Sequence, residues 1–417
     1  MIVDKQRYEK SDFDSMHIKM ASIPELHRPE GKLYAICMKS PFEIMCLLSY
    51  LRDKDGALLL LHGDTPLETA KKLAADAHCN YLVYGKLTEI LKLCEFNDAQ
   101  VPSLFQYSSG TTGEPKLIAR TWAEIDDEIN GYNQKLVSSA TPIILVPVSH
   151  SYGLIAGLMA GIKRGIEPVV VFDKNPKFAI HTIHSFEKSI VYGVPFIFQL
   201  LDTMGRGHLR YDQLISSGAP LSESLLQRLQ QTSADVFQQY GCTEAGCISI
   251  GHSLASSSDV GKPLPHIRMM MREEADGHDS AISPQEIVVM NGKREIYTRD
   301  LGFISEQGTL HVLGRMDDLI NVSGMKVIPS EVERIIGNIH GVVESVVYRI
   351  QHKVWGEAVK ALVVASNDIK AEEIRAWCMT QLPAYKVPSV IELVKEIPRL
   401  QSGKISRKLL VEQEWNK

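Results

Sequence analysis

The sequence predicts an α/β protein with a large N-terminal domain over residues 1–315 and a small α+β C-terminal domain over residues 316–417. Three observations support this prediction. The chain has 417 residues, more than one hydrophobic core usually organises. Apolar strands and helices alternate up to about residue 250, which is typical of largely parallel sheets with helices on both faces. The pattern then changes to short antiparallel strands, which indicates a smaller β subdomain within the large domain.

Short apolar runs define the strands expected in the N-terminal domain. ALLLLHG (57–63) and YLVYG (81–85) are two early examples. The alternation continues with TPIILVPV (141–148), an apolar helix near 153–163 and EPVVVF (167–172). Three further strands are expected at IVYGVP (190–195), LRYDQLISSG (209–218) and DVFQQYG (235–241), with the amphipathic helix LSESLLQRLQQ (221–231) between the last two.

The segment GRMDDLINVSGMKVIPSEVERII (314–336) marks the expected domain boundary. Ser330 and Glu333 have the spacing of a capping box, which predicts that a helix begins there. Strands and a helix alternate after this point, as expected for a small α+β domain, and the basic tail PRLQSGKISRK (398–408) follows.

Composition excludes several classes of protein. The chain is 44% hydrophobic and 23% charged, with a net charge of −5, so nucleic acid or an anionic membrane is not expected as a partner. The polar N-terminus lacks the apolar core of a signal peptide, and no apolar run is long enough to span a bilayer. The 7 cysteines and 14 histidines show no metal-ligand spacing. We therefore expect a cytoplasmic protein with reduced, mostly buried thiols and no structural zinc.

The stretch YSSGTTGEPK (107–116) has the composition of a phosphate-binding loop. Gly110 and Gly113 allow a close backbone approach, and the surrounding hydroxyls can donate to phosphate oxygens. The stretch fails the Walker pattern in spacing and in its final residue, which disfavours a kinase-type phosphotransferase. A polar turn would rarely hold so many such residues by chance. The expected donors and cation are Ser108, Ser109, Thr111, Thr112 and Lys116.

SSGTTGEPK resembles the phosphate loop of the adenylate-forming superfamily, which includes acyl- and aryl-CoA synthetases, peptide-synthetase adenylation domains and luciferases. Five further segments resemble family motifs in the expected order. They are SSGAPLS (216–222), QQYGCTEAG (238–246), YTRDLG (297–302), GRMDDLINVSGMKVIPSEVE (314–333) and PRLQSGKISRK (398–408). The resemblance implies an enzyme that uses ATP and Mg²⁺ to convert a carboxylic acid into an acyl-adenylate.

The resemblance also implies roles for single residues. The backbone of Gly218, Ala219 and Pro220 would lie along adenine, and Tyr240 would stack on it. Thr243 would lie near the α-phosphate, while Asp300 and Arg315 would lie near the ribose. Asp317 would be the pivot of a hinge.

Two residues would neutralise charge during catalysis. A carboxylate that attacks the α-phosphate brings two anions together, so cations must compensate the developing charge. The resemblance assigns this task to Mg²⁺ held by Glu244 and to Lys404, the C-terminal catalytic lysine. Taken alone, each residue would be an ordinary surface charge, and only its place in the ordered motifs indicates otherwise.

The acyl pocket is expected where VPVSHSYGL (146–154) ends a strand, at the edge where α/β sheets bind ligands. The resemblance assigns His150 to gating this pocket, and a buried structural histidine is the alternative. Relatives that activate ortho-hydroxylated benzoates carry asparagine where this chain has Ser151, which argues against such acids. A pocket lined by small side chains would suit a compact, flat acid. We expect this lining at Gly193, Ser217, Cys242 and Cys247.

The chain has 107 residues before the nine-residue phosphate-loop motif, fewer than most family members, so we expect a shortened N-terminal part. This length resembles stand-alone ligases that load aryl acids onto carrier proteins in siderophore biosynthesis, with 3,4-dihydroxybenzoate as the expected acid. The acyl group would pass from AMP to a phosphopantetheine thiol, with Gly324 leaving room for the pantetheine arm.

Two alternatives to this function remain open. Free coenzyme A is the alternative thiol acceptor, whereas a carrier protein would need a modest basic rim, for which Lys326, Lys353 and Lys360 are candidates. A non-catalytic nucleotide-sensing or scaffold protein of the same fold would predict loss of Lys404, Glu244 or Asp300. All three residues are present.

Overall fold

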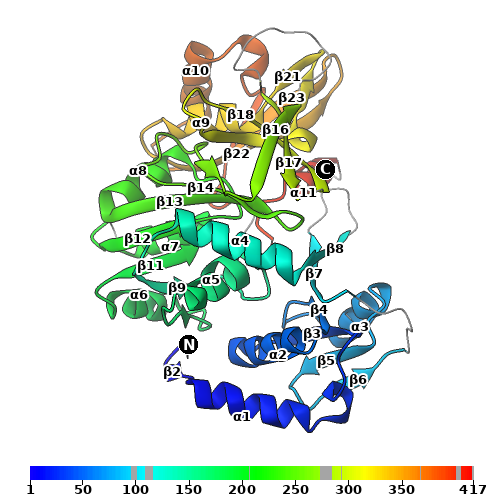
Figure 1. Cartoon of the computed structure of the whole chain (residues 1–417). Helices are drawn as coiled ribbons and strands as arrows, with labels where there is room; N and C mark the ends of the chain where they lie inside the picture. The colour runs from blue at the N-terminus through cyan, green and yellow to red at the C-terminus, as the bar shows by residue number, and fades with distance from the viewer. Residues whose placement is uncertain are drawn as a thin grey trace.

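The structure is a computed structural model and describes residues 1–94, 101–108, 116–205, 207–272, 284–292, 294–366, 368–400 and 405–415. Within these residues the chain forms sheets of nine, six, five and four strands (Figure 1). The α/β class is confirmed, as are the smaller β portion and the C-terminal α+β portion. The division at residues 315 and 316 stays a prediction; there the chain leaves β19 and enters the short helix η3 (Met316–Asp318).

The nine-stranded sheet has the order β15-β14-β13-β12-β11-β9-β10-β1-β2, and its strands from β13 to β1 run parallel. One side is covered by α4, the π-helix η2 and α5, and the other by α6, α7 and α8 (Figure 1). The strands are β1 (Ile2–Val3), β2 (Gln6–Arg7), β9 (Thr141–Ile144), β10 (Val169–Val170), β11 (Ser189–Gly193), β12 (Tyr211–Ser216), β13 (Ser233–Cys242), β14 (Gly246–Gly251) and β15 (Lys262–Pro263). The helices are α4 (Trp122–Lys135), η2 (Tyr152–Met159), α5 (Ala160–Lys163), α6 (Pro176–His184), α7 (Pro195–Gly205) and α8 (Glu223–Thr232).

The six-stranded sheet has the order β6-β5-β3-β4-β7-β8, and β5, β3, β4 and β7 run parallel. Its two faces pack against α2 and α3 respectively. The strands are β3 (Leu33–Met38), β4 (Ala57–Leu60), β5 (Tyr81–Gly85), β6 (Ile90–Lys92), β7 (Ser103–Ser108) and β8 (Lys116–Thr121). The helices are α1 (Lys10–Ala21), η1 (Pro24–Leu26), α2 (Pro41–Asp53) and α3 (Leu67–Asp76). Strands β7 and β8 flank the phosphate-loop segment.

Two smaller sheets follow along the chain. The four-stranded sheet is antiparallel, with β16 (Ile267–Arg272), β17 (Gln285–Asn291), β18 (Arg294–Ile304) and β19 (Leu310–Arg315). The five-stranded sheet has a core of its own against α9 and α10. Its elements are β20 (Ile320–Val322), β21 (Met325–Val327), α9 (Pro329–Gly337), β22 (Val342–His352), β23 (Gly356–Ala365), α10 (Ala371–Gln381), η4 (Ala384–Lys386) and β24 (Val390–Leu393), and helix α11 (Arg407–Trp415) covers its other face.

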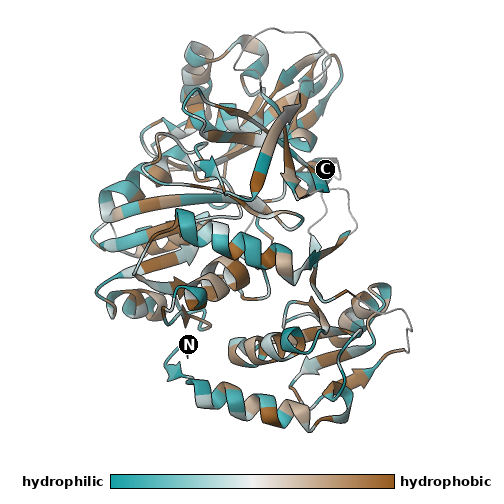
Figure 2. Ribbon diagram, viewed as in Figure 1, coloured by the Kyte–Doolittle hydropathy of each residue, from teal (hydrophilic) through white to brown (hydrophobic). Residues whose placement is uncertain are grey.

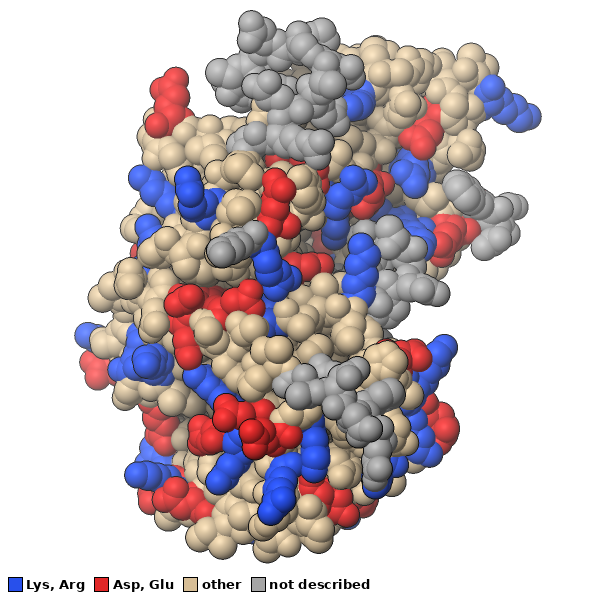
Figure 3. Space-filling model, turned by 45° about the vertical axis from the view of Figure 1, so that its right-hand side comes forward, with Lys and Arg blue, Asp and Glu red and all other residues tan. Residues whose placement is uncertain are grey.

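Hydropathy follows this architecture. In Figure 2 the parallel strands of the nine-stranded sheet carry much of the hydrophobic colour, whereas α1 and α8 are mostly hydrophilic. Positive and negative side chains are interspersed over the face that Figure 3 shows. Among the described residues, no helix combines the length and the apolar character needed to cross a bilayer.

The predicted capping box at Ser330 and Glu333 is wrong. Helix α9 begins at Pro329, with Ile328 in the N-cap position, because proline favours the first helical position. The Ser330 hydroxyl instead donates to the carbonyl oxygen of Leu313 in β19. The Glu333 carboxylate accepts hydrogen bonds from Arg407 and from the backbone of β22. Both side chains therefore make tertiary contacts rather than caps.

Glycine spacing brings the apolar helix close to β9. A Cβ at Gly153 would lie 2.6 Å from the Pro147 carbonyl oxygen, and one at Gly161 would lie 2.9 Å from Cγ of Pro142. A Cβ at Gly157 would lie 3.0 Å from Cγ1 of Ile144. The helix predicted near 153–163 is present, but its first eight residues are π-helical. This close packing holds the start of the helix against the carboxyl end of β9.

Candidate active site

The predicted ligand-binding segments meet at one edge of the nine-stranded sheet, because parallel strands end on the same side. The loop after β9 carries His150 and Ser151, and β11 ends at Gly193. Strand β12 leads into Ser217, whose backbone N–H donates to the Gly193 carbonyl oxygen at 3.3 Å. The remaining segments there are Gly218, Ala219 and Pro220 after β12, and Cys242, Thr243 and Glu244 at the end of β13.

A buried glutamine ties the six-stranded sheet to this edge. Gln106 in β7 is 6% exposed, and its Nε2 donates to the Ser149 carbonyl oxygen at 3.2 Å. The Ser151 hydroxyl donates to Oε1 of the same glutamine. Ser151 is therefore already engaged within the protein. Sequence reasoning missed Gln106, although a polar residue inside the buried strand SLFQYS was a usable signal.

His150 is exposed, so the alternative of a buried structural histidine is wrong. Its ring centroid lies 6.3 Å from that of His62, which follows β4 in the six-stranded sheet. Next to His62, Asp64 forms an ion pair with Lys39 across 2.7 Å. Sequence reasoning missed His62, since residues 88 positions apart in the chain gave no sign of proximity.

Tyr240, Asp300 and Arg315 form one cluster, as expected for residues of a common nucleotide site. The Tyr240 hydroxyl donates to Oδ2 of Asp300 at 2.7 Å, and Nε of Arg315 lies 3.5 Å from Oδ1. Burial raises the pKa of Asp300, while the Tyr240 hydrogen bond and the Arg315 charge act in the opposite direction. Burial, followed by the Asp300 charge, holds the pKa of Tyr240 well above its ordinary value. Tyr240 therefore stays protonated, and its hydroxyl donates a hydrogen bond to the Asp300 carboxylate.

The turn from Cys242 to Gly246, called here the acidic turn, joins β13 to β14. Thr243 and Glu244 are partly exposed on it. Burial and then the nearby Glu244 charge raise the pKa of Cys242 to about 12. Cys247, which follows the turn, is 1% exposed, and burial holds its pKa well above the usual value. Both thiols are therefore neutral and behave as small apolar groups.

The acidic turn fits Mg²⁺ better than a metal held by protein ligands alone. Among the described residues, no three His, Cys, Asp or Glu side chains gather as a metal cage. Mg²⁺ usually takes one or two carboxylates from the protein and its other oxygen ligands from water and phosphates. Glu244, next to the Thr243 hydroxyl, offers a carboxylate suited to that arrangement.

Asp317 lies between the four-stranded and five-stranded sheets. Its carboxylate accepts from Nη2 of Arg299 in β18 at 2.9 Å, and its carbonyl oxygen accepts from Arg349 in β22 at 3.2 Å. Residues of the four-stranded and the five-stranded sheets therefore both bind Asp317, the predicted hinge residue. In the β20–β21 turn, Gly324 has a φ of +89°, and no heavy atom of the described residues lies within 4 Å of the position that a Cβ would take.

Lys360 does not belong to a basic rim. It is 5% exposed, and its Nζ lies 2.6 Å from Glu414 and 2.9 Å from Glu392. Strand β23, which carries Lys360, pairs with β20, β22 and β24. Helix α11 covers the sheet face on which Lys360 lies. Lys326 and Lys353 are exposed, as predicted.

Four predicted residues lie outside the described residues: Ser109, Thr111, Thr112 and Lys404. Their flanks are described. Ser108 and Lys116 pair across β7 and β8, and the Ser108 hydroxyl lies 3.4 Å from the Lys116 carbonyl oxygen. Arg399, before Lys404, binds Glu344 and lies 4.8 Å from the ring centroid of Phe196. Phe196 is the second residue of α7, which follows Gly193 closely, so Arg399, five residues before Lys404, lies at the edge that carries the predicted site.

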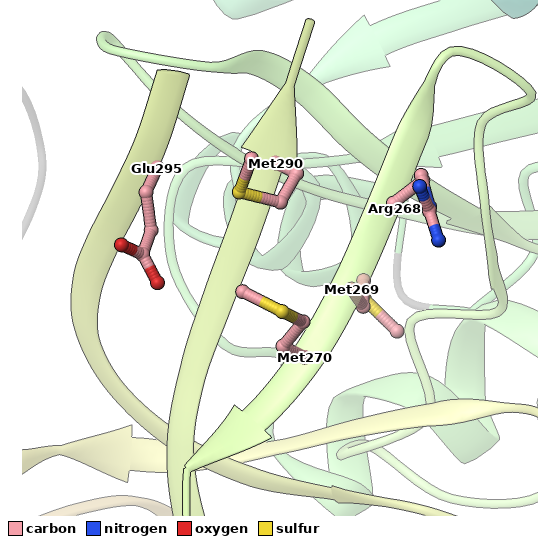
Figure 4. Close-up of a pocket in the computed structure, with 5 residues that line it drawn as sticks. All are labelled: Arg268, Met269, Met270, Met290 and Glu295. Carbon is pink, nitrogen blue, oxygen red and sulfur yellow. The ribbon is translucent and has the colours of Figure 1, made fainter. Parts of the chain in front are cut away.

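A hollow on the four-stranded sheet contains none of these residues. Figure 4 shows its lining on β16, β17 and β18; the residues are Arg268, Met269, Met270, Met290 and Glu295. We assign it no part in the site.

Comparison with known proteins agrees with this geometry. Residues 52–289 match the family model of the AMP-binding enzymes, and residues 331–404 match that of the AMP-binding enzyme C-terminal domain. The chain belongs to the AMP-binding enzyme family. It is 46% identical to the 3,4-dihydroxybenzoate–[aryl-carrier protein] ligase of Bacillus anthracis, over 98% of both chains.

More distant relatives extend the comparison. A 2-succinylbenzoate–CoA ligase of Bacillus cytotoxicus is 26% identical over 98% of this chain and 95% of its own. Two solved structures share the fold. ATP-bound MatB from Rhodopseudomonas palustris has a TM-score of 0.84 at 19% identity, covering 99% of this chain and 95% of its own. The o-succinylbenzoate CoA synthetase MenE from Bacillus subtilis, with ATP and magnesium, has a TM-score of 0.81 at 21% identity, covering 98% and 95%.

Proposed function

We propose that this protein is an AMP-forming acid–thiol ligase for a small aromatic acid, 3,4-dihydroxybenzoate. The acceptor is the phosphopantetheine thiol of an aryl carrier protein, and the product serves siderophore biosynthesis. The 46% identity over 98% of both chains with a ligase named for this acid and acceptor carries the proposal. The site supports it with a nucleotide cluster and a set of small, neutral side chains at one sheet edge.

The first half-reaction joins the acid to AMP. A carboxylate oxygen attacks the α-phosphorus of ATP, the bond to the β-phosphate oxygen breaks, and pyrophosphate leaves. Asp300 and Arg315 hold the ribose, and Tyr240 orients Asp300 while its ring packs on adenine. Lys404 neutralises charge as it develops. Mg²⁺, when bound at Glu244, supplies further neutralisation of the phosphates.

The acid pocket lies between the loop after β9 and the ends of β11, β12 and β13. Gly193 excludes a larger residue, because a Cβ there would lie 2.8 Å from Cζ of Phe198. Cys242 and Cys247 supply neutral walls. The Ser151 hydroxyl is engaged with Gln106, which is consistent with an acid that lacks an ortho hydroxyl.

The second half-reaction transfers the acyl group. A thiolate attacks the acyl carbon, and AMP leaves with its phosphate oxygen. We propose that residues 316–417 rotate about Asp317 between the two steps, as a mobile domain. Rotation would break the Arg299–Asp317 ion pair at 2.9 Å and the Arg399–Phe196 contact at 4.8 Å. Gly324 would then leave room for the pantetheine arm.

Free coenzyme A is the competing acceptor, because more distant relatives are named as CoA ligases. The described exposed lysines near Gly324, Lys326 and Lys353, form only a modest basic rim. Coenzyme A would favour a denser basic patch for its 3′-phosphate. A direct comparison of the two acceptors separates these functions.

Acid-dependent pyrophosphate exchange tests the proposal. A panel of benzoates, aliphatic acids and amino acids should show the highest kcat/KM for 3,4-dihydroxybenzoate; activity with fatty acids alone would overturn the proposal. Lys404→Ala should abolish most adenylation but spare thioester formation from preformed adenylate. Asp317→Pro should spare adenylation and block the second step. Equal loss of both steps in either variant would contradict its assigned role.

A further inference from the structure

A buried ion pair outside the predicted site connects the phosphate-loop strand to the acidic turn. Arg120 lies in β8, four residues after Lys116, and Glu128 lies in α4. Nη2 of Arg120 is 2.5 Å from Oε2 of Glu128, and both side chains are 3% exposed. Desolvation makes such a pair a weak source of stability compared with hydrophobic residues of similar volume. Its contacts therefore indicate what it does.

The pair is in direct contact with the end of the acidic turn. The second oxygen of Glu128, Oε1, accepts a hydrogen bond from the backbone N–H of Cys247 at 2.8 Å. Gly246 has a φ of +73°, and a Cβ there would overlap the Glu128 carboxylate and lie 2.6 Å from Nη1 of Arg120. The turn thus closes directly on the two side chains. Glu244 is two residues before Gly246 in the same turn.

The corner between β8 and α4 fixes the pair in place. The Thr121 hydroxyl accepts from the backbone of Glu124 at 3.2 Å, and the Glu124 carboxylate accepts from the backbone of Thr121 at 2.7 Å. This capping box places the N-cap of α4, Thr121, one residue after the arginine. The exit from the phosphate-loop segment, helix α4 and the acidic turn are therefore joined by short polar contacts.

We propose that Arg120 and Glu128 are positioning residues that hold the acidic turn, and with it Glu244, in register with the strand leaving the phosphate loop. The proposal rests on the proposed function, because it assigns the turn to the Mg·ATP side of the reaction. Neither side chain needs to touch the nucleotide. Their effect passes through the backbone at Gly246 and Cys247.

Two double variants separate positioning from stability. Arg120→Met with Glu128→Gln removes both charges but keeps an acceptor for the Cys247 N–H. Arg120→Met with Glu128→Leu removes the charges and the acceptor. Neutral, well-packed replacements of a buried pair are usually tolerated, so both proteins should fold. Asp127→Asn, an exposed carboxylate in the same helix, is the matched control for charge.

The readouts are hydrogen exchange of residues 242–250 in the free protein, and the KM for ATP and the Mg²⁺ concentration for half-maximal pyrophosphate exchange. The Leu variant should exchange faster over this segment and need about tenfold more Mg²⁺ or ATP, in the range seen when groups behind a metal ligand are lost. The Gln variant should stay within about threefold of the parent.

Equal hydrogen exchange and equal KM values in folded Leu and Gln variants would overturn the positioning role. If the Leu variant does not fold, Glu128→Asp provides the test: it keeps the charge but shortens the reach to Cys247, and it should raise the same KM values. An unchanged KM in Glu128→Asp would also overturn the role. If aryl acids do not stimulate pyrophosphate exchange by the parent protein, the proposed function is refuted. The hydrogen-exchange comparison of the variants still tests the positioning role in that case.

Discussion

Removing the Tyr240 hydroxyl should shift the acid limb of the pH profile to higher pH. The ionised Asp300 carboxylate would be the acceptor for ribose hydroxyls, so kcat/KM for ATP should fall as pH drops through the pKa of Asp300. Burial raises that pKa, and the 2.7 Å hydrogen bond from Tyr240 is the largest effect opposing the rise. Tyr240→Phe removes this opposition and leaves the Arg315 charge in place.

The magnitude follows from the hydrogen bond. A hydrogen bond to a charged group contributes about 1.5–3 kcal/mol, and one pKa unit corresponds to about 1.4 kcal/mol. The Asp300 side chain is 17% exposed, so solvent screening reduces the value only modestly. The acid limb should therefore move upward by about one to two pH units in Tyr240→Phe.

The assay is kcat/KM for ATP in pyrophosphate exchange between pH 5 and pH 9, which reports the free enzyme. Asp300→Asn should remove the limb and lower kcat/KM at neutral pH. The folded-state pKa of Asp300 is raised, so its contribution to stability is present at low pH and is lost as pH rises through that pKa. Asp300→Asn should therefore not lower the Tm at neutral pH. An unmoved acid limb in Tyr240→Phe, or a limb that persists in Asp300→Asn, would refute this reasoning.

Three further predictions follow from contacts away from the nucleotide. Phe196→Leu should slow adenylation about two- to fivefold, because an exposed cation–π contact contributes about 0.5–1 kcal/mol, and it should spare thiolation of preformed adenylate. Equal slowing of both half-reactions would count against a role for the Arg399–Phe196 contact in adenylation. Lys360→Met should lower the free energy of unfolding by about 2–4 kcal/mol in thermal or urea unfolding, because Glu392 and Glu414 lose their cation. The exposed control Lys353→Met should leave the free energy of unfolding unchanged, and similar losses in both variants would contradict the burial argument. Alkylation with N-ethylmaleimide at pH 7 should be slow and should leave pyrophosphate exchange intact, because burial raises the pKa of all seven thiols. Rapid inactivation would show that one of these thiols is reactive.

Local sequence patterns predicted much of the fold. Alternating apolar runs located the parallel strands, although β9 ends at Ile144, before the Pro147 that the apolar run included. Pairing of distant segments was not visible. Strand β1 pairs with β10 in the nine-stranded sheet, while Phe13 of α1 packs edge-on against Phe42 of α2 beside the six-stranded sheet. The first 21 residues thus bridge two sheets, which two-residue strands do not reveal in a sequence.

Motif order predicted the site better than any single residue could. Tyr240, Asp300 and Arg315 come together from three strands, as expected for one nucleotide site. The supporting residues gave no such signal. In ARTWAEIDDE (119–128), Arg120 and Glu128 look like ordinary surface charges of an amphipathic helix entry. Their burial depends on β14 packing against α4, which is a tertiary contact that local periodicity does not specify.

Charged residues within strands were also hard to assign. Lys360 is the single polar residue in the apolar run VKALVV, and a single lysine is almost always placed in solvent. Helix α11 covers that face and supplies Glu414, so the lysine is buried as part of an ion-pair network. Helix α11 lies 47 to 55 positions after Lys360 in the sequence, and composition does not predict which sheet face this helix covers.

Single-turnover transfer tests the proposed function most directly. Purified protein, ATP, Mg²⁺ and 3,4-dihydroxybenzoate would be mixed with an equimolar phosphopantetheinylated aryl carrier protein, with its unmodified form, or with free coenzyme A. Intact-mass analysis would follow the acyl-thioester on the carrier, and chromatography would follow acyl-CoA. The proposed function predicts rapid, stoichiometric acylation of the phosphopantetheinylated carrier, none of the unmodified form, and much slower acyl-CoA formation. Faster acyl-CoA formation, or an adenylate that never reaches the carrier thiol, would contradict it.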